Sequence, residues 1–206
     1  MRILFQGDSI TDANRIRDNE PYCGMGYPIL VTSELGFEEP GKYEFFNRGI
    51  SGNRIVDIYA RIKCDIINLQ PDIMSFLVGV NDVWHELRPV PNGVDAEKFY
   101  KVYDMMIEEI KAALPDIKII ILEPFALKGT ATEENWEVFY AEVKLRAQMA
   151  KKVAEKHNLP FVPLQEGFEK LCEKAEPAYW LRDGVHPTPM GHEYIKNEWM
   201  KAFKTL

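Results

Sequence analysis

Short apolar runs alternate along the chain with longer segments of helical periodicity. Five runs are strand-like, and several are apolar at successive positions, as in strands covered on both faces: residues 2–6, 43–47, 73–78, 118–122 and 161–163. Apolar residues recur at spacings of three and four over residues 26–35, 55–69, 96–114, 136–157 and 189–203. This alternation predicts an α/β protein in which helices cover both faces of a parallel sheet.

The chain has the length and composition of one domain. It contains 206 residues, of which 46% are hydrophobic, so we expect residues 1–206 to bury a single core. No repeat, low-complexity tract or linker interrupts it. The loops at residues 88–95 and 125–135 are the notable insertions, and each is a candidate lid or rim of a site.

Charge and targeting signals narrow the range of partners. The formal charge is −7, from 25 basic and 32 acidic residues, and the basic residues are interleaved with acids, so no nucleic-acid partner is expected. Cys23, Cys64 and Cys172 lie far apart, which argues against a disulfide framework and a CxxC zinc site and fits a reducing compartment. The start MRILFQGDS lacks a secretory apolar region, and no segment approaches the roughly 18 to 20 apolar residues that span a bilayer. We therefore expect a cytoplasmic protein with no membrane partner, while self-association into a homo-oligomer is left open.

Polar residues and glycines follow the first three predicted strands. Ser9 lies in LFQGDSITD after the first strand, Gly52 in NRGISGN after the second, and Asn81 in GVNDVW after the third. Ligands bind where the carboxyl ends of parallel strands meet, so these residues are expected to share one edge of the sheet. The Gly52 backbone N–H and the Asn81 side-chain amide are candidate donors to an oxyanion.

An acid and a histidine occur together near the end of the chain. In RDGVHPTPMGH, Asp183 precedes His186 by three residues, a spacing that one helical turn brings together. A carboxylate bonded to one ring nitrogen fixes the tautomer and leaves the other nitrogen to take a serine proton. Thr188 and Pro189 are predicted as the N-cap and first residue of the closing helix. Each feature is common by chance, but their order and placement together favour a Ser-His-Asp hydrolase with Ser9 as nucleophile.

These four blocks resemble those of the SGNH hydrolases, the superfamily of GDSL-type esterases and lipases. The matched positions run from residue 7 to residue 186. The resemblance implies a three-layer α/β/α flavodoxin-like fold with a parallel sheet of about five strands. It also implies a catalytic triad of Ser9, Asp183 and His186, with an oxyanion hole formed by the Ser9 amide, Gly52 and Asn81. This chemistry uses no cofactor and no metal.

The strings GDSITD, NRGISGN and GVNDVW resemble, more narrowly, those of bacterial acetylxylan esterases and related carbohydrate deacetylases. The resemblance implies a small acyl ester as substrate, most specifically an acetylated oligosaccharide such as an acetylated xylo-oligosaccharide. The bulky and polar residues that follow Asn81 favour a short acyl pocket and a polar acceptor side. The candidate substrate contacts are Asp8, Trp84, His85, Tyr179 and Trp180.

Other activities stay open at this point. A thioesterase or lysophospholipase of the same family would act on longer acyl chains, and a non-catalytic carbohydrate-binding protein would also use exposed aromatic rings. A nucleotide-binding domain is disfavoured because Gly24–Gly26 forms only a G-x-G that does not directly follow a strand.

Two further enzyme classes depend on acids and histidines. A glycosidase would need facing carboxylates, which Glu123 with Asp8, Asp12 or Asp82 leaves formally open. A metal hydrolase would have to combine His85, His186 and His192, yet these residues lack a metal-binding spacing such as HExxH. His192 is expected to be structural, inside the closing helix.

Overall fold

The fold is centred on a five-stranded parallel sheet. The computed structural model describes residues 1–20 and 22–206. The strands are β1 (Arg2–Gly7), β2 (Glu44–Asn47), β3 (Ile73–Leu77), β4 (Lys118–Leu122) and β5 (Phe161–Val162). They are ordered β2-β1-β3-β4-β5, and every neighbouring pair is parallel. This is the flavodoxin-like order, so the predicted fold class is confirmed.

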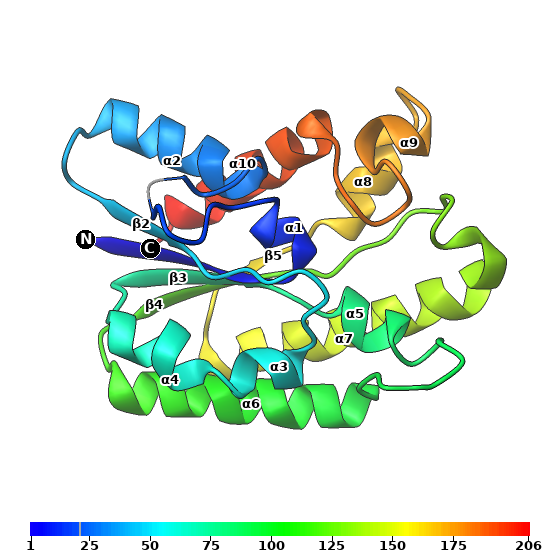
Figure 1. Ribbon diagram of the computed structural model, residues 1–206, viewed down its shortest axis with the longest axis horizontal. Coiled ribbons are helices and arrows are strands. Elements are labelled where there is room, and N and C mark those ends of the chain that lie inside the picture. The colour runs from blue at the N-terminus through cyan, green and yellow to red at the C-terminus, as the bar shows by residue number, and fades with distance from the viewer. Residues whose placement is uncertain (21) are drawn as a thin grey trace.

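Helices cover both faces of the sheet (Figure 1). The longer helices on one face are α2 (Tyr27–Glu38), α8 (Gln165–Leu171) and α10 (Pro189–Phe203), with the short α9 (Pro177–Trp180) nearby. The opposite face is covered by α3 (Ile55–Tyr59), α4 (Ile62–Asp65), α6 (Ala96–Ala113) and α7 (Trp136–His157). The described residues also form four short elements: α1 (Ser9–Asp12), α5 (Val80–Trp84) and the 3-10 turns Ile67–Leu69 and Glu133–Asn135. Among the described residues, no helix has both the length and the apolar character needed to cross a membrane.

Successive strand residues pack into different cores, because side chains alternate between the faces of a strand. Ile3 and Phe5 of β1 join the cluster formed with α2 and α10, whereas Leu4 joins the cluster formed with α3 and α6. Thr188 caps α10 by accepting a hydrogen bond from the Gly191 N–H, and Pro189 is the first helical residue, as predicted.

The prediction of one helix over residues 55–69 is wrong. The segment forms α3, α4 and a 3-10 turn at Ile67–Leu69. Six β-branched residues give it little intrinsic helical preference. At the break, the Arg61 guanidinium is held by the Asn53 side chain and the Arg48 carbonyl, which pins the chain before α4 begins.

Candidate active site

Ser9 lies at the carboxyl edge of the sheet, where β1 and β3 are neighbours. Gly7 ends β1, and a Cβ at this position would lie 2.4 Å from the Leu77 carbonyl oxygen and 2.4 Å from Thr11 Oγ1. Only glycine therefore fits at this bend without a rearrangement. Asp8 then caps α1 by accepting a hydrogen bond from the Ile10 N–H at 3.0 Å, and Ser9 is the first residue of that helix. The abrupt Gly-Asp-Ser sequence is thus a strand end that turns into a capped helix.

Ser9, His186 and Asp183 form a hydrogen-bonded chain. Ser9 Oγ lies 3.0 Å from His186 Nε2, and His186 Nδ1 lies 2.7 Å from Asp183 Oδ2. Because an ionised carboxylate only accepts hydrogen bonds, Nδ1 carries the ring proton and Nε2 is free to accept the serine proton. The structure therefore brings together the three residues that the sequence suggested as a triad.

The Asp183 carboxylate also organises its own turn. Its Oδ1 accepts hydrogen bonds from the N–H groups of Val185 and His186, at 3.0 and 2.8 Å. Partial burial favours the protonated acid, but the hydrogen bonds from the His186 ring and from these two N–H groups outweigh it and hold the pKa of Asp183 well below its ordinary value. Asp183 is thus ionised throughout the neutral range and holds the ring in one orientation.

The loop at residues 125–135 packs behind this turn. The Leu127 N–H donates to the Gly184 carbonyl at 2.8 Å, and the Ala131 N–H donates to the Asp183 carbonyl at 3.0 Å. A Cβ on Gly129 would lie only 2.5 Å from the Asp183 carbonyl carbon. This loop therefore supports the acid–base turn from behind.

The loop at residues 88–95 is tied to α5 at its end. The Val94 N–H donates to the Asp82 carbonyl at 3.0 Å, and the Asn92 N–H donates to the His85 carbonyl at 2.9 Å. These bonds anchor the end of the loop to the scaffold of the site.

Three N–H donors are available at the same edge of the sheet. Among the described residues, neither the Ser9 nor the Gly52 backbone N–H bonds a protein acceptor. Asn81, which is 6% exposed, uses one side-chain N–H in a 3.3 Å bond to the Asn53 carbonyl and has a second one free to donate. The Gly52 loop is held against α1, because the Ser51 N–H and hydroxyl both donate to the Asp12 carboxylate. Such donors can stabilise negative charge on a substrate oxygen.

The other acids near the site serve as structural acceptors. Asp8 is 1% exposed, burial raises its pKa to about 7, and its carboxyl accepts from the Ile10 N–H. Its role as a substrate contact stays a prediction. Burial likewise raises the pKa of Asp82 well above its ordinary value, and its carboxyl accepts from the Ile55 N–H. Glu123 accepts from two N–H groups at the start of α8. These acids therefore offer no facing pair for a glycosidase.

A cavity of about 320 Å³ opens beside Ser9 and His186. Its other lining residues are Ile10, Ala13, Asn14, Met25, Ser51, Arg182, Pro187, Pro189 and His192. Ala13 and Asn14 both have positive φ, at 40° and 59°, a left-handed conformation that is uncommon for such residues and that clusters at functional sites. The sequence did not identify Arg182 or His192 as lining a site. The available signal was position, since both flank the Asp183–His186 turn.

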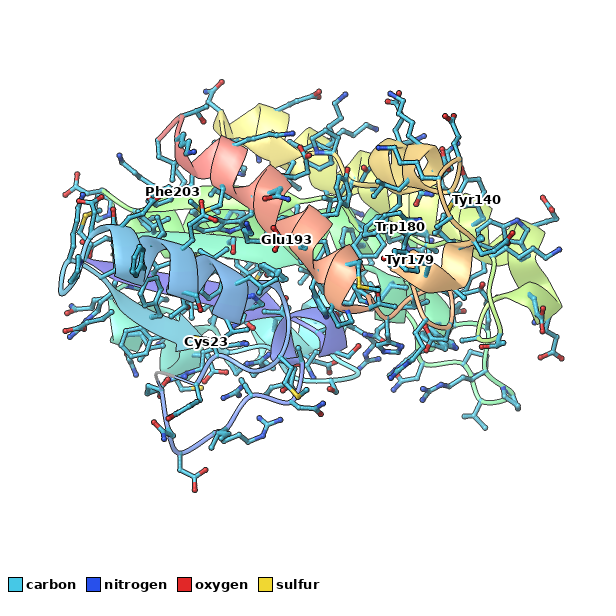
Figure 2. All side chains as sticks on the ribbon, turned by 90° about the horizontal axis from the view of Figure 1, so that it is seen from above. Cys23, Tyr140, Tyr179, Trp180, Glu193 and Phe203 are labelled. Atoms are coloured by element: carbon cyan, nitrogen blue, oxygen red, sulfur yellow. The ribbon has the colours of Figure 1, made fainter. Side chains whose placement is uncertain are left out.

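The predicted aromatic contacts lie around the site but do not line this cavity. The Trp84 ring packs against His186, with ring centroids 6.0 Å apart, and against Phe139. Figure 2 shows Tyr179 and Trp180 side by side at α9; Tyr179 is 48% exposed, whereas Trp180 packs against the core. His85, at the end of α5, is partly exposed, and burial together with Arg88 and Arg54 lowers its pKa.

The histidines do not converge on a metal site. His186 uses both ring nitrogens within the Ser-His-Asp chain, and His192 Nδ1 accepts from a backbone N–H. Among residues 1–20 and 22–206, the one group with the right ligand types is Asp104, Glu108 and His157, whose ligand atoms lie within 4.8 Å of one another. The Lys156 ammonium bonds both acids there, so it already compensates part of their negative charge.

A flavodoxin-like sheet that carries a hydrogen-bonded Ser-His-Asp chain defines a serine hydrolase class of protein, because such triads are identified by geometry and not by sequence order. Comparison with known families identifies the family within this class. The GDSL-like Lipase/Acylhydrolase family matches residues 5–194, and the chain belongs to this family.

Individual relatives agree with this assignment. An acetylxylan esterase of Geobacillus stearothermophilus is 30% identical over 97% of this chain and 92% of its own. The crystal structure of Axe2, an acetylxylan esterase from the same organism, has a TM-score of 0.85 at 29% identity, covering 98% of this chain and 93% of that one. A GDSL-like protein from Parabacteroides merdae has a TM-score of 0.92 at 36% identity, covering 98% and 95%. The protein is therefore a carboxylic ester hydrolase.

Proposed function

We propose that the protein is a serine esterase that removes acetyl groups from sugar hydroxyls, with acetylated xylo-oligosaccharides as substrates. The observation that carries this proposal is the Ser9–His186–Asp183 chain opening onto a small polar cavity. The similarity to acetylxylan esterases supports the choice of acetyl group and sugar.

The reaction proceeds in two half-reactions. Ser9 Oγ attacks the acyl carbonyl carbon while its proton passes to His186 Nε2, and Asp183 stabilises the imidazolium that forms. Collapse of the tetrahedral intermediate breaks the bond to the sugar oxygen, which takes the proton from Nε2 and leaves as a hydroxyl. Water then attacks the acyl-enzyme with the same base, releasing acetate and restoring Ser9.

Charge on the carbonyl oxygen is stabilised by the Ser9 and Gly52 N–H groups and the Asn81 amide. The free backbone donors need no rearrangement, and the contacts of Ser51 with Asp12 hold the Gly52 loop in place. Fixed donors of this kind stabilise the transition state more than the neutral ester, so they act on kcat.

The cavity favours a short acyl group and an oxygen-rich acceptor. Its volume of about 320 Å³ lies at the small end of ligand pockets, and more than half of its lining residues are polar. A thioesterase or lysophospholipase would need a long apolar groove beside the nucleophile. Trp84 occupies space next to the His186 ring, which further restricts the room around the reacting atoms.

A substrate panel tests the proposal. It compares p-nitrophenyl acetate, butyrate and octanoate, a palmitoyl thioester, peracetylated xylose and glucose, acetylated xylo-oligosaccharides and N-acetylglucosamine. Each buried methylene is worth about 0.8 kcal/mol in a pocket built to hold it, so a long-chain enzyme would strongly prefer octanoate. We expect acetate to be the preferred acyl group and acetylated xylosides to release it. Preference for octanoate or the thioester, with no acetate released from sugars, would refute the carbohydrate assignment.

A further inference from the structure

His192 lines the same cavity as the two reacting residues Ser9 and His186. It lies in the first turn of α10 and is 6% exposed. A buried ring with polar atoms needs partners for both nitrogens, so the use of each nitrogen shows what the ring can offer to a ligand.

The hydrogen bond at Nδ1 fixes the tautomer of the ring. Nδ1 lies 3.1 Å from the backbone nitrogen of Tyr27, which is the first residue of α2 and can only donate. Nδ1 must therefore be unprotonated, and the ring proton of the neutral imidazole sits on Nε2. Among the described residues, no protein atom bonds Nε2, and Nε2 is not one of the buried polar atoms without a partner. This atom therefore reaches the space that the cavity encloses.

The ring is also held in position by its neighbours. A Cβ on Gly26 would lie 2.8 Å from His192 Cε1, so the backbone of residue 26 packs directly against the ring. Burial, followed by the charge of His186, lowers the pKa of His192 to about 4, and the ring stays neutral at neutral pH. His192 thus presents one N–H in a fixed direction and does not compete with His186 as a base.

We propose that the His192 Nε2–H donates a hydrogen bond to an oxygen of the acceptor sugar, and so selects polyhydroxylated acceptors over simple leaving groups. This role rests on the proposed function, since the cavity must hold the sugar side of the ester. A donor fixed before binding loses little conformational freedom when the sugar arrives, which is how one hydrogen bond contributes to specificity.

Two substitutions test the roles of the two ring nitrogens of His192 separately. In His192→Asn, the short side chain keeps an acceptor near the Nδ1 position for the Tyr27 N–H but has no donor near the Nε2 position. In His192→Gln, the longer side chain places an amide N–H near the Nε2 position but loses the acceptor at Nδ1. The measured quantity is the kcat/KM for acetylated xylo-oligosaccharides divided by the kcat/KM for p-nitrophenyl acetate.

The expected results differ between the two variants. For His192→Asn the ratio falls about three- to tenfold, mainly through KM, because one neutral hydrogen bond is lost, while the thermal unfolding temperature stays near that of the wild type. For His192→Gln the ratio stays within about twofold of the wild type, while the unfolding temperature falls because the Tyr27 N–H is left unpaired. The proposal would be overturned if the ratio and the unfolding temperature fell together in both variants. It would also be overturned if the ratio fell in neither variant.

A direct measurement keeps the proposal testable whatever the variants do. In wild-type protein with ¹⁵N-labelled histidine, the Nε2 signal of His192 is expected to be that of a protonated nitrogen and to shift on addition of unacetylated xylotriose. His157, which bonds Asp104 elsewhere in the fold, is the control and should not shift. An unmoved His192 signal would refute the contact with sugar, even if the enzyme releases acetate from xylosides. Failure to release acetate, by contrast, would refute the proposed function itself.

Discussion

The buried carboxyl of Asp8 should make the stability of this protein fall as the pH rises. Burial raises the pKa of Asp8 from 3.8 to about 7, and the hydrogen bond from the Ile10 N–H, with the charge of His186 and the neighbouring Asn81 side chain, offsets the burial only in part. Between about pH 4 and pH 7 the folded chain therefore holds a proton that the unfolded chain has lost. The unfolded state binds fewer protons in this window, so the free energy of unfolding decreases with pH. The shift corresponds to about 4 kcal/mol once the pH exceeds the folded pKa.

The substitution Asp8→Asn removes this ionisation and keeps the helix cap. Asparagine is as good an N-cap as aspartate, and its side-chain oxygen can still accept from the Ile10 N–H. The buried neighbour Asp82 is present in both the wild type and the variant. Loss of the Asp8 charge makes Asp82 easier to ionise. We expect the stability of the variant relative to the wild type to rise by about 3 kcal/mol between pH 5 and pH 9.

Urea unfolding at pH 5 and pH 9 measures this difference. In a domain of this size, about 3 kcal/mol corresponds to a change of roughly 6 to 12 °C in the relative unfolding temperature, so thermal scans provide a second assay. Asp116→Asn is the matched control, because Asp116 is exposed and its replacement should leave the pH dependence as in the wild type. If Asp8→Asn and the wild type lose stability in parallel across this range, the buried carboxyl is not the source of the effect.

Three further predictions concern the reaction. Ser9→Ala should abolish hydrolysis and labelling by a serine-reactive phosphonate. Asp183→Asn should lower kcat by about 10⁴-fold, less than the serine substitution, because the asparagine amide forces the wrong His186 tautomer. Wild-type activity in either variant would exclude the triad. Asn81→Ala should lower kcat by about 10² to 10³-fold with little change in KM, and the reverse pattern in steady-state kinetics would make Asn81 a substrate binder. Gly129→Ala should displace the Asp183 backbone and lower kcat without touching substrate; an unchanged kcat would show that the loop tolerates the methyl group.

Much of the fold was predictable because strand and helix periodicity depends on which face is buried. All five strands form close to their predicted positions, and the long helices α6, α7 and α10 begin where the pattern begins. The short helices α1 and α5 were missed, since elements of four and five residues are too brief to show a helical period. The prediction of one helix over residues 55–69 was wrong because separate short helices can bury the same apolar residues. Tertiary hydrogen bonds from the Arg61 side chain hold the chain at the break between them.

The residues of the site could be predicted from the sequence where their spacing along the chain determines how close their side chains lie. Asp183 and His186 are three residues apart, and the turn that joins them closes through hydrogen bonds within that interval. Ser9 was identified by its place after a strand, and the parallel sheet brings it to His186, 177 residues away in the chain. The roles of all three in the reaction stay predictions until they are measured.

What the tertiary structure alone decided is how each polar group is buried and which groups share a cavity. Asp8 and His192 are ordinary polar residues in the sequence, yet one is enclosed beneath the sheet edge and the other lines the cavity with its tautomer set by a helix from the opposite end of the chain. The cavity is formed by segments around residues 9–14, 25, 51 and 182–192. The periodicity of polar and apolar residues cannot predict that these segments form one cavity. Burial and desolvation depend on how distant segments pack, whereas sequence patterns describe only local repeats of polarity.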